Sequence, residues 1–363
     1  MPGPTPTSLE TRDESLERAL FEIKRVIAGQ DTMLERLLVC LLADGHLLME
    51  GVPGLAKTLT IKTSAQVLGG TFNRIQFTPD LMPSDLVGTR VYRPKDGSFD
   101  VELGPVFCNF LLADEINRAP AKVQSALLEV MQERQVTIGK ESFAAPHPFL
   151  VMATQNPIES EGTYPLPEAQ VDRFMLKVVV GYPGPEDELT VVERSLAGLA
   201  SVRSVVTLDE LLALRERVRD VYVDPALSRY AVQVACATRE PESVGLADLK
   251  PYVAFGVSPR GPISLMSAAR AHALVHGREY VLPQDVLDLA KDALHHRIVL
   301  SYEALAAEVG ADAIVDAVLE AVPVPEIDLV ERAARPPSAS STNARPTAQG
   351  RARSRRPCCA RST

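Results

Sequence analysis

The stretch HLLMEGVPGLAKTLT, residues 46–60, decides the fold of this chain. Residues 46–50 form a short apolar run of the length of a strand buried in a parallel sheet. The small residues that follow would let backbone N–H groups close on phosphate oxygens, and the N-terminus of a helix would add partial positive charge. We therefore predict a phosphate-binding loop at the start of a helix. Its residues are Gly51, Val52, Pro53, Gly54, Leu55, Ala56, Lys57, Thr58 and Leu59.

Two side chains at the end of this loop predict a nucleotide triphosphate and Mg²⁺ as cofactors. Lys57 would reach the β- and γ-phosphates, and Thr58 would place its hydroxyl on the metal ion. The generic pattern G-x-x-x-x-G-K-[ST] has glycine where this chain has Ala56. Alanine is tolerated at the onset of a helix if its φ angle is below zero.

A second apolar run, FLLA at residues 110–113, ends in two adjacent acids, Asp114 and Glu115. Because the carboxyl ends of parallel strands meet at one sheet edge, these acids should lie beside the phosphate loop. Asp114 is predicted to hold Mg²⁺, and Glu115 to orient or deprotonate the water that attacks the γ-phosphate. Asn156 follows the strand expected at residues 149–153 and should emerge at the same edge, where its amide could hold that water or the phosphate.

The remaining periodicity predicts an α/β fold with a doubly wound parallel sheet, followed by a smaller all-α domain. Five apolar runs are separated by helices or by insertions, and two insertions, residues 91–106 and 135–143, read as hairpins. The helical pattern begins at residue 183. The predicted division is a disordered N-terminus (1–13), an α/β core (14–182), a helical domain (183–322) and a disordered basic tail (335–363).

Composition narrows the class of protein. The net charge of −9 and pI of about 5.3 argue against a dedicated duplex-DNA binder. Five cysteines without ligand-like spacing argue against a disulfide framework and a zinc site. The N-terminus lacks the features of a signal peptide, and no apolar run approaches the ~20 residues of a membrane span. We expect a cytoplasmic protein.

Two features outside the phosphate-site motifs have more than one interpretation. Gly29-Gln30, just before the first strand, would be a plain helix–helix turn or would cover an adenine ring, with Gln30 in contact with the base. His272 and His276 are four residues apart on a predicted helix and could share a face. Because no third ligand with suitable spacing is recognisable in the sequence, we expect them to be structural.

Together these stretches resemble the MoxR family of AAA+ ATPases, over about residues 19–321. The strings that carry the resemblance are GVPGLAKT from residue 51, LLADEINRAP from 111, QSALLEVMQE from 124, ATQNPIESEGTYPLPEAQVDRF from 153 and GVSPRG from 256. The resemblance implies a P-loop ATPase module followed by a helical lid. It also implies that alanine at position 56 is this family's usual residue.

The resemblance assigns a role to each matching position. Lys57 and Thr58 correspond to the Walker A pair, and Asp114 and Glu115 to the Walker B pair. The three remaining correspondences are Asn156 as the first sensor, Arg173 as the arginine finger and Arg260 as the second sensor. Within Ser258-Pro259-Arg260, Ser258 would cap a helix and Pro259 would take its first position. Since AAA+ proteins generally supply the finger from a neighbouring subunit, Arg173 implies a ring, most simply a hexamer.

By this resemblance the protein is an ATP-hydrolysing chaperone or remodeller of protein clients. A von Willebrand factor A domain partner and maturation of an enzyme complex, such as metal or cofactor insertion, are typical of the family. One alternative is an AAA+ nucleic-acid motor, although the 91–106 hairpin lacks a basic-aromatic pattern. The other is an adaptor that binds ATP without hydrolysing it, against which the presence of Glu115, Asn156 and Arg173 argues.

Overall fold

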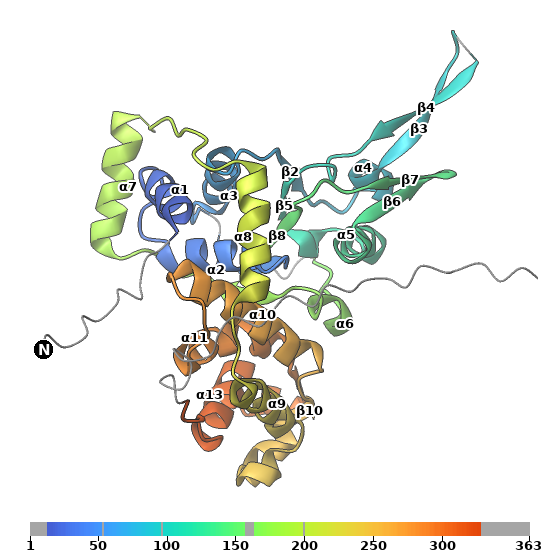
Figure 1. Ribbon diagram of the computed structural model, residues 1–363. Helices are drawn as coiled ribbons and strands as arrows, with labels where there is room; N and C mark the ends of the chain where they lie inside the picture. The colour runs from blue at the N-terminus through green and yellow to red at the C-terminus, as the bar shows by residue number, and fades with distance from the viewer. Residues whose placement is uncertain (1–12, 53, 96, 157–162, 199, 328–363) are drawn as a thin grey trace, which may run out of the picture. The chain divides into compact units, whose positions relative to one another are not determined.

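A five-stranded parallel sheet organises the chain. The computed structural model describes residues 13–52, 54–95, 97–156, 163–198 and 200–327 (Figure 1). The strand order is β2-β5-β8-β1-β9, so the first strand along the chain lies inside the sheet. The strands are β1 (Leu47–Glu50), β2 (Phe72–Gln76), β5 (Phe110–Asp114), β8 (Leu150–Gln155) and β9 (Leu176–Val179). This is the doubly wound sheet that the five apolar runs predicted.

The register aligns the carboxyl ends of the strands. Glu50, the last residue of β1, pairs with Gln155 at the end of β8, and Gln76 of β2 pairs with Asp114 of β5. Parallel pairing therefore places the residues that follow each strand at one edge of the sheet. The phosphate loop, Glu115 and Asn156 all leave the sheet at this edge.

Helices cover both faces of the sheet, because alternate residues of each strand point to opposite sides. Leu111 and Ala113 of β5 pack with Val123 and Leu127 of α5 in one buried cluster, while α3 packs against β5 from the other helical layer. The helical segments of this part are α1 (Glu14–Lys24), α2 (Asp31–Leu42), α3 (Lys57–Val67), α4 (Pro83–Val87), η1 (Ile116–Arg118), α5 (Ala121–Glu133) and α6 (Glu168–Val171).

Both predicted hairpins are present. One consists of β3 (Gly88–Arg93) and β4 (Ser98–Leu103), and the other of β6 (Gln135–Ile138) and β7 (Glu141–Ala144). They extend in the same direction in Figure 1, and β3 contacts β6. Among the described residues, neither hairpin adds a strand to the central sheet.

The C-terminal part is helical, as predicted, with one addition. Residues Val253–Phe255 (β10) and Val299–Leu300 (β11) form a small antiparallel pair, which the helical periodicity did not predict. The helices are α7 (Pro185–Ala197), α8 (Leu208–Asp220), α9 (Pro225–Arg239), η2 (Pro241–Val244), η3 (Ala247–Tyr252), α10 (Arg260–Val275), α11 (Pro283–Leu294), η4 (His295–Arg297), α12 (Tyr302–Ala306) and α13 (Ala311–Ala321).

The predicted domain boundaries remain predictions. The segment assigned to a disordered N-terminus and the basic tail at 335–363 fall outside the described residues, except Asp13, whose carboxylate caps α1 by accepting from Ser15 N–H. None of the described helices is long and apolar enough to cross a bilayer.

Candidate functional site

The phosphate loop runs from the end of β1 to Lys57, where α3 begins. Gly51 lies so close to β9 that a Cβ there would meet the Val180 carbonyl oxygen at 2.6 Å, so this position requires glycine. The Lys57 ammonium donates to the Gly51 carbonyl at 2.5 Å. Burial lowers the pKa of Lys57, while Asp114 and the neighbouring acids oppose this shift. Pro53 lies outside the described residues.

Ala56 corrects one expectation. Its φ angle is +56°, in the left-handed region, so the condition of a φ angle below zero is not met. The reason is local geometry: Ala56 is the residue immediately before α3, and the loop must turn there so that the first helical N–H groups face the loop interior. This conformation is the one in which glycine costs least, which explains the glycine of the generic pattern.

The loop and the strand ends enclose one cavity of about 390 Å³. It contains ten of the predicted site residues and three that were not predicted. The predicted residues are Gly51, Gly54, Leu55, Ala56, Lys57, Thr58, Leu59, Asp114, Glu115 and Asn156. The others are Arg74, Thr154 and Gln155. Val52 is in the loop but does not line this cavity.

Thr154 connects the two acids. Its hydroxyl donates to Asp114 Oδ1 at 2.6 Å and accepts from the Glu115 N–H at 2.9 Å. Thr154 is 2% exposed, so these bonds are protected from water. Glu115 has a φ angle of +56°, and its carboxylate lies 3.1 Å from Arg118 Nε. The carboxylates of Asp114 and Glu115 are thereby held in different orientations although the residues are adjacent.

Arg74 occupies the other side of Asp114. Its Nη2 donates to Asp114 Oδ2 at 2.6 Å and to Gln76 Oε1 at 3.0 Å. The pair lies across β2 and β5 at the cavity wall. The sequence offered only a weak signal for this residue, a cation in a short strand, Phe72–Gln76, that ends at the same sheet edge.

The oxygen donors of the cavity fit a magnesium ion. The Thr58 hydroxyl and the Asp114 carboxylate are hard oxygen ligands, the kind that Mg²⁺ prefers, and both line the same cavity as Lys57. Two further requirements of a nucleotide site are met, a lysine at a helix start and small residues in the loop.

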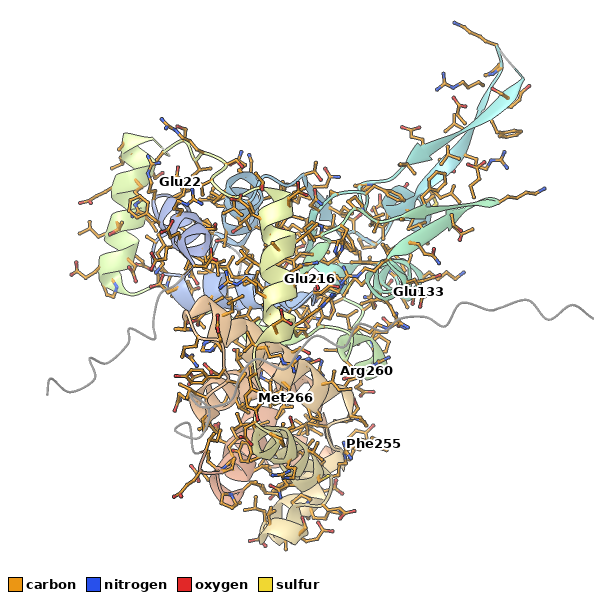
Figure 2. The ribbon with its side chains drawn as sticks, viewed as in Figure 1. Glu22, Glu133, Glu216, Phe255, Arg260 and Met266 are labelled. Carbon is orange, nitrogen blue, oxygen red and sulfur yellow. The ribbon has the colours of Figure 1, made fainter. Side chains whose placement is uncertain are left out.

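Arg173 and Arg260 line a different cavity, of about 250 Å³, with His46 and Gln132. Arg173 follows Asp172, and the Arg173 Nε has no hydrogen-bond partner among the described residues. Arg260 is the first residue of α10 and lies beside the end of α6 in Figure 2. The structure thus does not bring these two arginines to the phosphate loop of their own chain.

The lid contacts the residue before Arg173. Asp172 accepts from Ser258 Oγ at 3.1 Å, and its carboxylate lies 3.4 Å from Arg260 Nη1 and 2.9 Å from the buried Arg297 Nε. Burial lowers the pKa of Arg297 to about 10 despite the opposing effect of Asp172. Pro259 precedes α10 as its cap and does not take the predicted first helical position, while Ser258 Oγ accepts from Arg260 N–H at 3.2 Å.

Gln30 lies in a third cavity, of about 400 Å³, lined also by Gly29, Met33 and residues 178–182. It adjoins the phosphate loop, since Val180 touches Gly51. The structure is compatible with both interpretations of Gly29-Gln30, a turn and an adenine contact.

Comparisons with known proteins agree with this geometry. A model of the ATPase family associated with various cellular activities (AAA) matches residues 46–176, and a model of the AAA lid domain matches residues 247–318. The chain is 56% identical over 316 residues to Chaperone MoxR1 of Mycobacterium tuberculosis, covering 87% of this chain and 84% of that protein. The chain belongs to the MoxR family of AAA+ ATPases.

Further relatives span similar lengths. Protein MoxR of Paracoccus denitrificans is 36% identical over 319 residues, which cover 83% of this chain and 93% of that protein. The crystal structure of an ATPase candidate from Cytophaga hutchinsonii matches with a TM-score of 0.82 and 47% identity, over 86% of this chain and 95% of that one. The MoxR-family resemblance, the P-loop fold with a helical lid and the ATPase activity predicted from the sequence are confirmed.

Proposed function

We propose that this MoxR-family ATPase hydrolyses ATP at sites shared between neighbouring subunits of a ring, most simply a hexamer. One observation carries the proposal: Lys57 and the two acids line one cavity, while Arg173 and Arg260 line another. A cationic residue acting on the γ-phosphate must reach it, and Arg173 is not in the cavity of its own phosphate loop. A neighbouring subunit that presents Arg173 and Arg260 to this loop satisfies the requirement.

Each residue of the cavity has a proposed part in turnover. Lys57 and the loop N–H groups bind the phosphates, and Thr58 and Asp114 hold Mg²⁺, which supplies positive charge against the phosphate oxygens. Glu115 accepts a proton from the attacking water, and Asn156 positions that water or the γ-phosphate. Arg173 from the neighbour stabilises the charge that develops in the transition state, an effect worth roughly 10³–10⁵ in rate for arginine fingers. The cavity that contains Gln30 takes the adenine.

Asp172 connects the lid to Arg173, the residue that we place at the shared site. Three lid side chains, Ser258, Arg260 and Arg297, meet its carboxylate, and Arg173 is the next residue. A displacement of the lid on nucleotide binding therefore moves the backbone that carries Arg173. We propose that this connection transmits nucleotide state between subunits.

The proposed biological role is that of a chaperone that remodels protein clients in the cytoplasm. Its support is the relative named Chaperone MoxR1 and the similar length of the two chains. A von Willebrand factor A domain protein as partner, and maturation of an enzyme complex by metal or cofactor insertion, complete the proposal. Co-purification of such a partner with the full chain tests it.

The test of the shared site is ATP turnover against protein concentration, with Lys57→Ala and Arg173→Ala variants. We expect turnover per subunit to rise with concentration in the wild type and to collapse in each variant. Mixing the two inactive variants should restore part of the activity, since some interfaces then pair an intact Lys57 with an intact Arg173. Turnover that is independent of concentration, with no recovery on mixing, contradicts the proposal.

Two measurements separate the alternatives. Glu115→Gln should bind ATP and lose turnover, whereas unchanged turnover would contradict the role of Glu115. For the nucleic-acid motor, two cations of the β3–β4 hairpin already have partners within it: Arg93 pairs with Asp100, and the Arg90 guanidinium lies 5.0 Å from the Phe99 ring centre. Turnover stimulated by DNA in a salt-sensitive manner would favour that alternative.

A further inference from the structure

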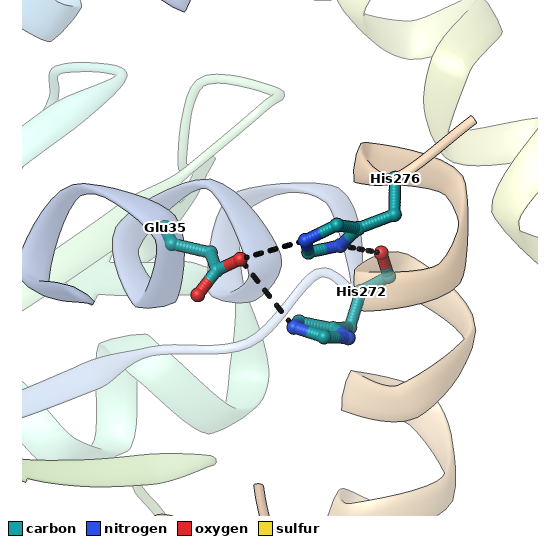
Figure 3. A group of neighbouring side chains, drawn as sticks. All are labelled: Glu35, His272 and His276. Atoms are coloured by element: carbon teal, nitrogen blue, oxygen red, sulfur yellow. Dashed lines mark hydrogen bonds and ion pairs between the residues drawn. The ribbon is translucent and has the colours of Figure 1, made fainter. Parts of the chain in front are cut away.

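Three side chains of metal-ligand type meet where α2 packs against α10. Glu35 comes from α2, His272 lies in the last turn of α10, and His276 is the residue that caps the C-terminal end of this helix (Figure 3). Glu35 Oε1 lies 3.4 Å from His272 Nε2 and 3.3 Å from His276 Nε2. The sequence placed the two histidines on one helical face without a third ligand, and the tertiary structure supplies that ligand from a helix far upstream.

The second nitrogen of each ring is already bonded. His272 Nδ1 donates to Asp285 Oδ1 at 2.7 Å, and His276 Nδ1 donates to the His272 carbonyl at 2.9 Å. In the neutral ring these bonds assign the proton to Nδ1 and leave the lone pair of Nε2 directed at Glu35. Metal-binding histidines usually donate their other N–H to a carboxylate or a backbone carbonyl in this way.

The residues that contact this cluster are fixed by further hydrogen bonds and ion pairs. Glu35 Oε2 lies 2.7 Å from Arg36 Nη1, which leaves Oε1 toward the histidines, and Arg36 Nε donates to Asp292 at 2.7 Å. Asp285 accepts from both terminal nitrogens of Arg278 at 2.6 Å. The orientations of the carboxylate and of both rings are therefore set before any ligand binds.

We propose that Glu35, His272 and His276 form a binding site for a divalent transition-metal ion of the zinc type. In a tetrahedral site with bonds of about 2.0–2.1 Å, neighbouring ligand atoms lie about 3.3–3.4 Å apart. The two separations from Glu35 Oε1 are 3.3 and 3.4 Å. Two imidazoles and a carboxylate suit Zn²⁺, and they leave a fourth position for water.

The surroundings allow that fourth ligand. The Glu35 side chain is 29% exposed and that of His276 33%, whereas His272 is buried. The cluster is therefore partly open to solvent on the side of Glu35 and His276. A bound ion would join α2, which precedes β1, to α10 of the lid, so it should raise the melting temperature of the chain.

A proton on His272 Nε2 competes with a metal ion for the same lone pair. Burial lowers the pKa of His272, but hydrogen bonds with Asp285 and Glu35 outweigh this effect and raise it to about 9. In that arrangement a charged imidazole lies between two carboxylates, and a metal ion must displace the proton from Nε2 before it can bind. The experiment must therefore measure the metal itself.

The test is a titration of the nucleotide-free chain with Zn²⁺ alone, followed by calorimetry and by melting temperature. Because thiols also bind zinc, the reference protein (called the parent) and all variants made from it carry serine at Cys236, Cys358 and Cys359. We expect one Zn²⁺ per chain and a higher melting temperature. Co²⁺ in place of Zn²⁺ should give the strong visible absorption of a tetrahedral site.

Variants at the two partly exposed ligands should remove binding without unfolding the chain. Glu35→Gln and His276→Gln should each lose at least about tenfold in affinity, the loss that even outer partners of a metal ligand produce. His147→Gln is the matched control, because His147 is exposed and outside the cluster, and it should bind zinc as the parent does. Failure of the parent to bind one equivalent, or unchanged binding in both ligand variants, would overturn the proposal.

Discussion

Arg74 and Asp114 form an ion pair across two neighbouring strands, with Nη2 2.6 Å from Oδ2, at the wall of the nucleotide cavity. The pair uses the carboxylate oxygen that is not bonded to Thr154. The guanidinium therefore competes with any cation that binds Asp114. When nucleotide and Mg²⁺ are absent, the charge of Asp114 is balanced by the Arg74 guanidinium.

The first prediction concerns this competition. Arg74→Met should lower the Mg²⁺ concentration that half-saturates ATP turnover by a few-fold, since a partly exposed ion pair is worth about 1 kcal/mol at most. Turnover measured over a range of Mg²⁺ concentrations at saturating ATP checks it. Arg93→Met, which breaks an ion pair in the β3–β4 hairpin, should leave the Mg²⁺ requirement unchanged. An unchanged requirement in Arg74→Met, with turnover reduced more than tenfold, would instead indicate that Arg74 acts on the nucleotide.

The second prediction concerns Thr154 as the connection between Asp114 and Glu115. Thr154→Val keeps the shape of the side chain and removes both hydrogen bonds, so the free energy of unfolding should fall by about 1–3 kcal/mol. Turnover should fall about 10–100-fold, as for other groups that orient a metal ligand. Thr238→Val is the matched control, because Thr238 is buried and makes two hydrogen bonds to the lid backbone. It should lose similar stability and keep its turnover per folded molecule; equal turnover losses in both variants would refute a specific role for Thr154.

The third prediction concerns the left-handed Ala56. An L-residue in this region costs roughly 1–2 kcal/mol, and glycine avoids the cost while adding about 0.4–1 kcal/mol of unfolded-state entropy. Ala56→Gly should therefore leave the free energy of unfolding of the nucleotide-free protein unchanged or raise it by about 0.5 kcal/mol. Ala213→Gly, at an exposed position inside α8, should lose about 1 kcal/mol. Chemical denaturation measures both, and a comparable loss at position 56 would show that the alanine is unstrained.

The fourth prediction concerns pH. His46 is buried, accepts from Val151 N–H at 3.0 Å and donates to the Met131 carbonyl at 3.2 Å. Burial lowers its pKa from 6.5 to about 3. Because the folded pKa is the lower one, the unfolded chain binds the extra proton between these values, and stability falls as the pH drops below 6.5.

His46→Gln should accordingly reduce the loss of stability on acidification. The contribution of one such group between pH 6.5 and 5 is up to about 2 kcal/mol. Denaturation at pH 7 and pH 5 gives the difference, and the exposed His147→Gln should retain the parental slope. If His46→Gln retains it too, His46 is not the titrating group.

The sequence by itself determined the sheet of this protein and the grouping of the candidate site residues at one of its edges. Short apolar runs specify strands, and parallel pairing brings whatever follows them to one edge, so Lys57, Asp114, Glu115 and Asn156 could be grouped without coordinates. The helical C-terminal part followed from helical periodicity, and its role as a lid from the family resemblance. These inferences depend on residues that are close in the chain and on a rule that holds for all parallel sheets.

Tertiary structure alone decided which side chains meet across elements. The pairing of Arg74 with Asp114, the separation of Arg173 and Arg260 from Lys57, and the approach of Glu35 to His272 all join residues far apart in the sequence. Such contacts depend on strand register, helix rotation and side-chain direction. Local propensity does not encode these three quantities, because they result from packing the whole core.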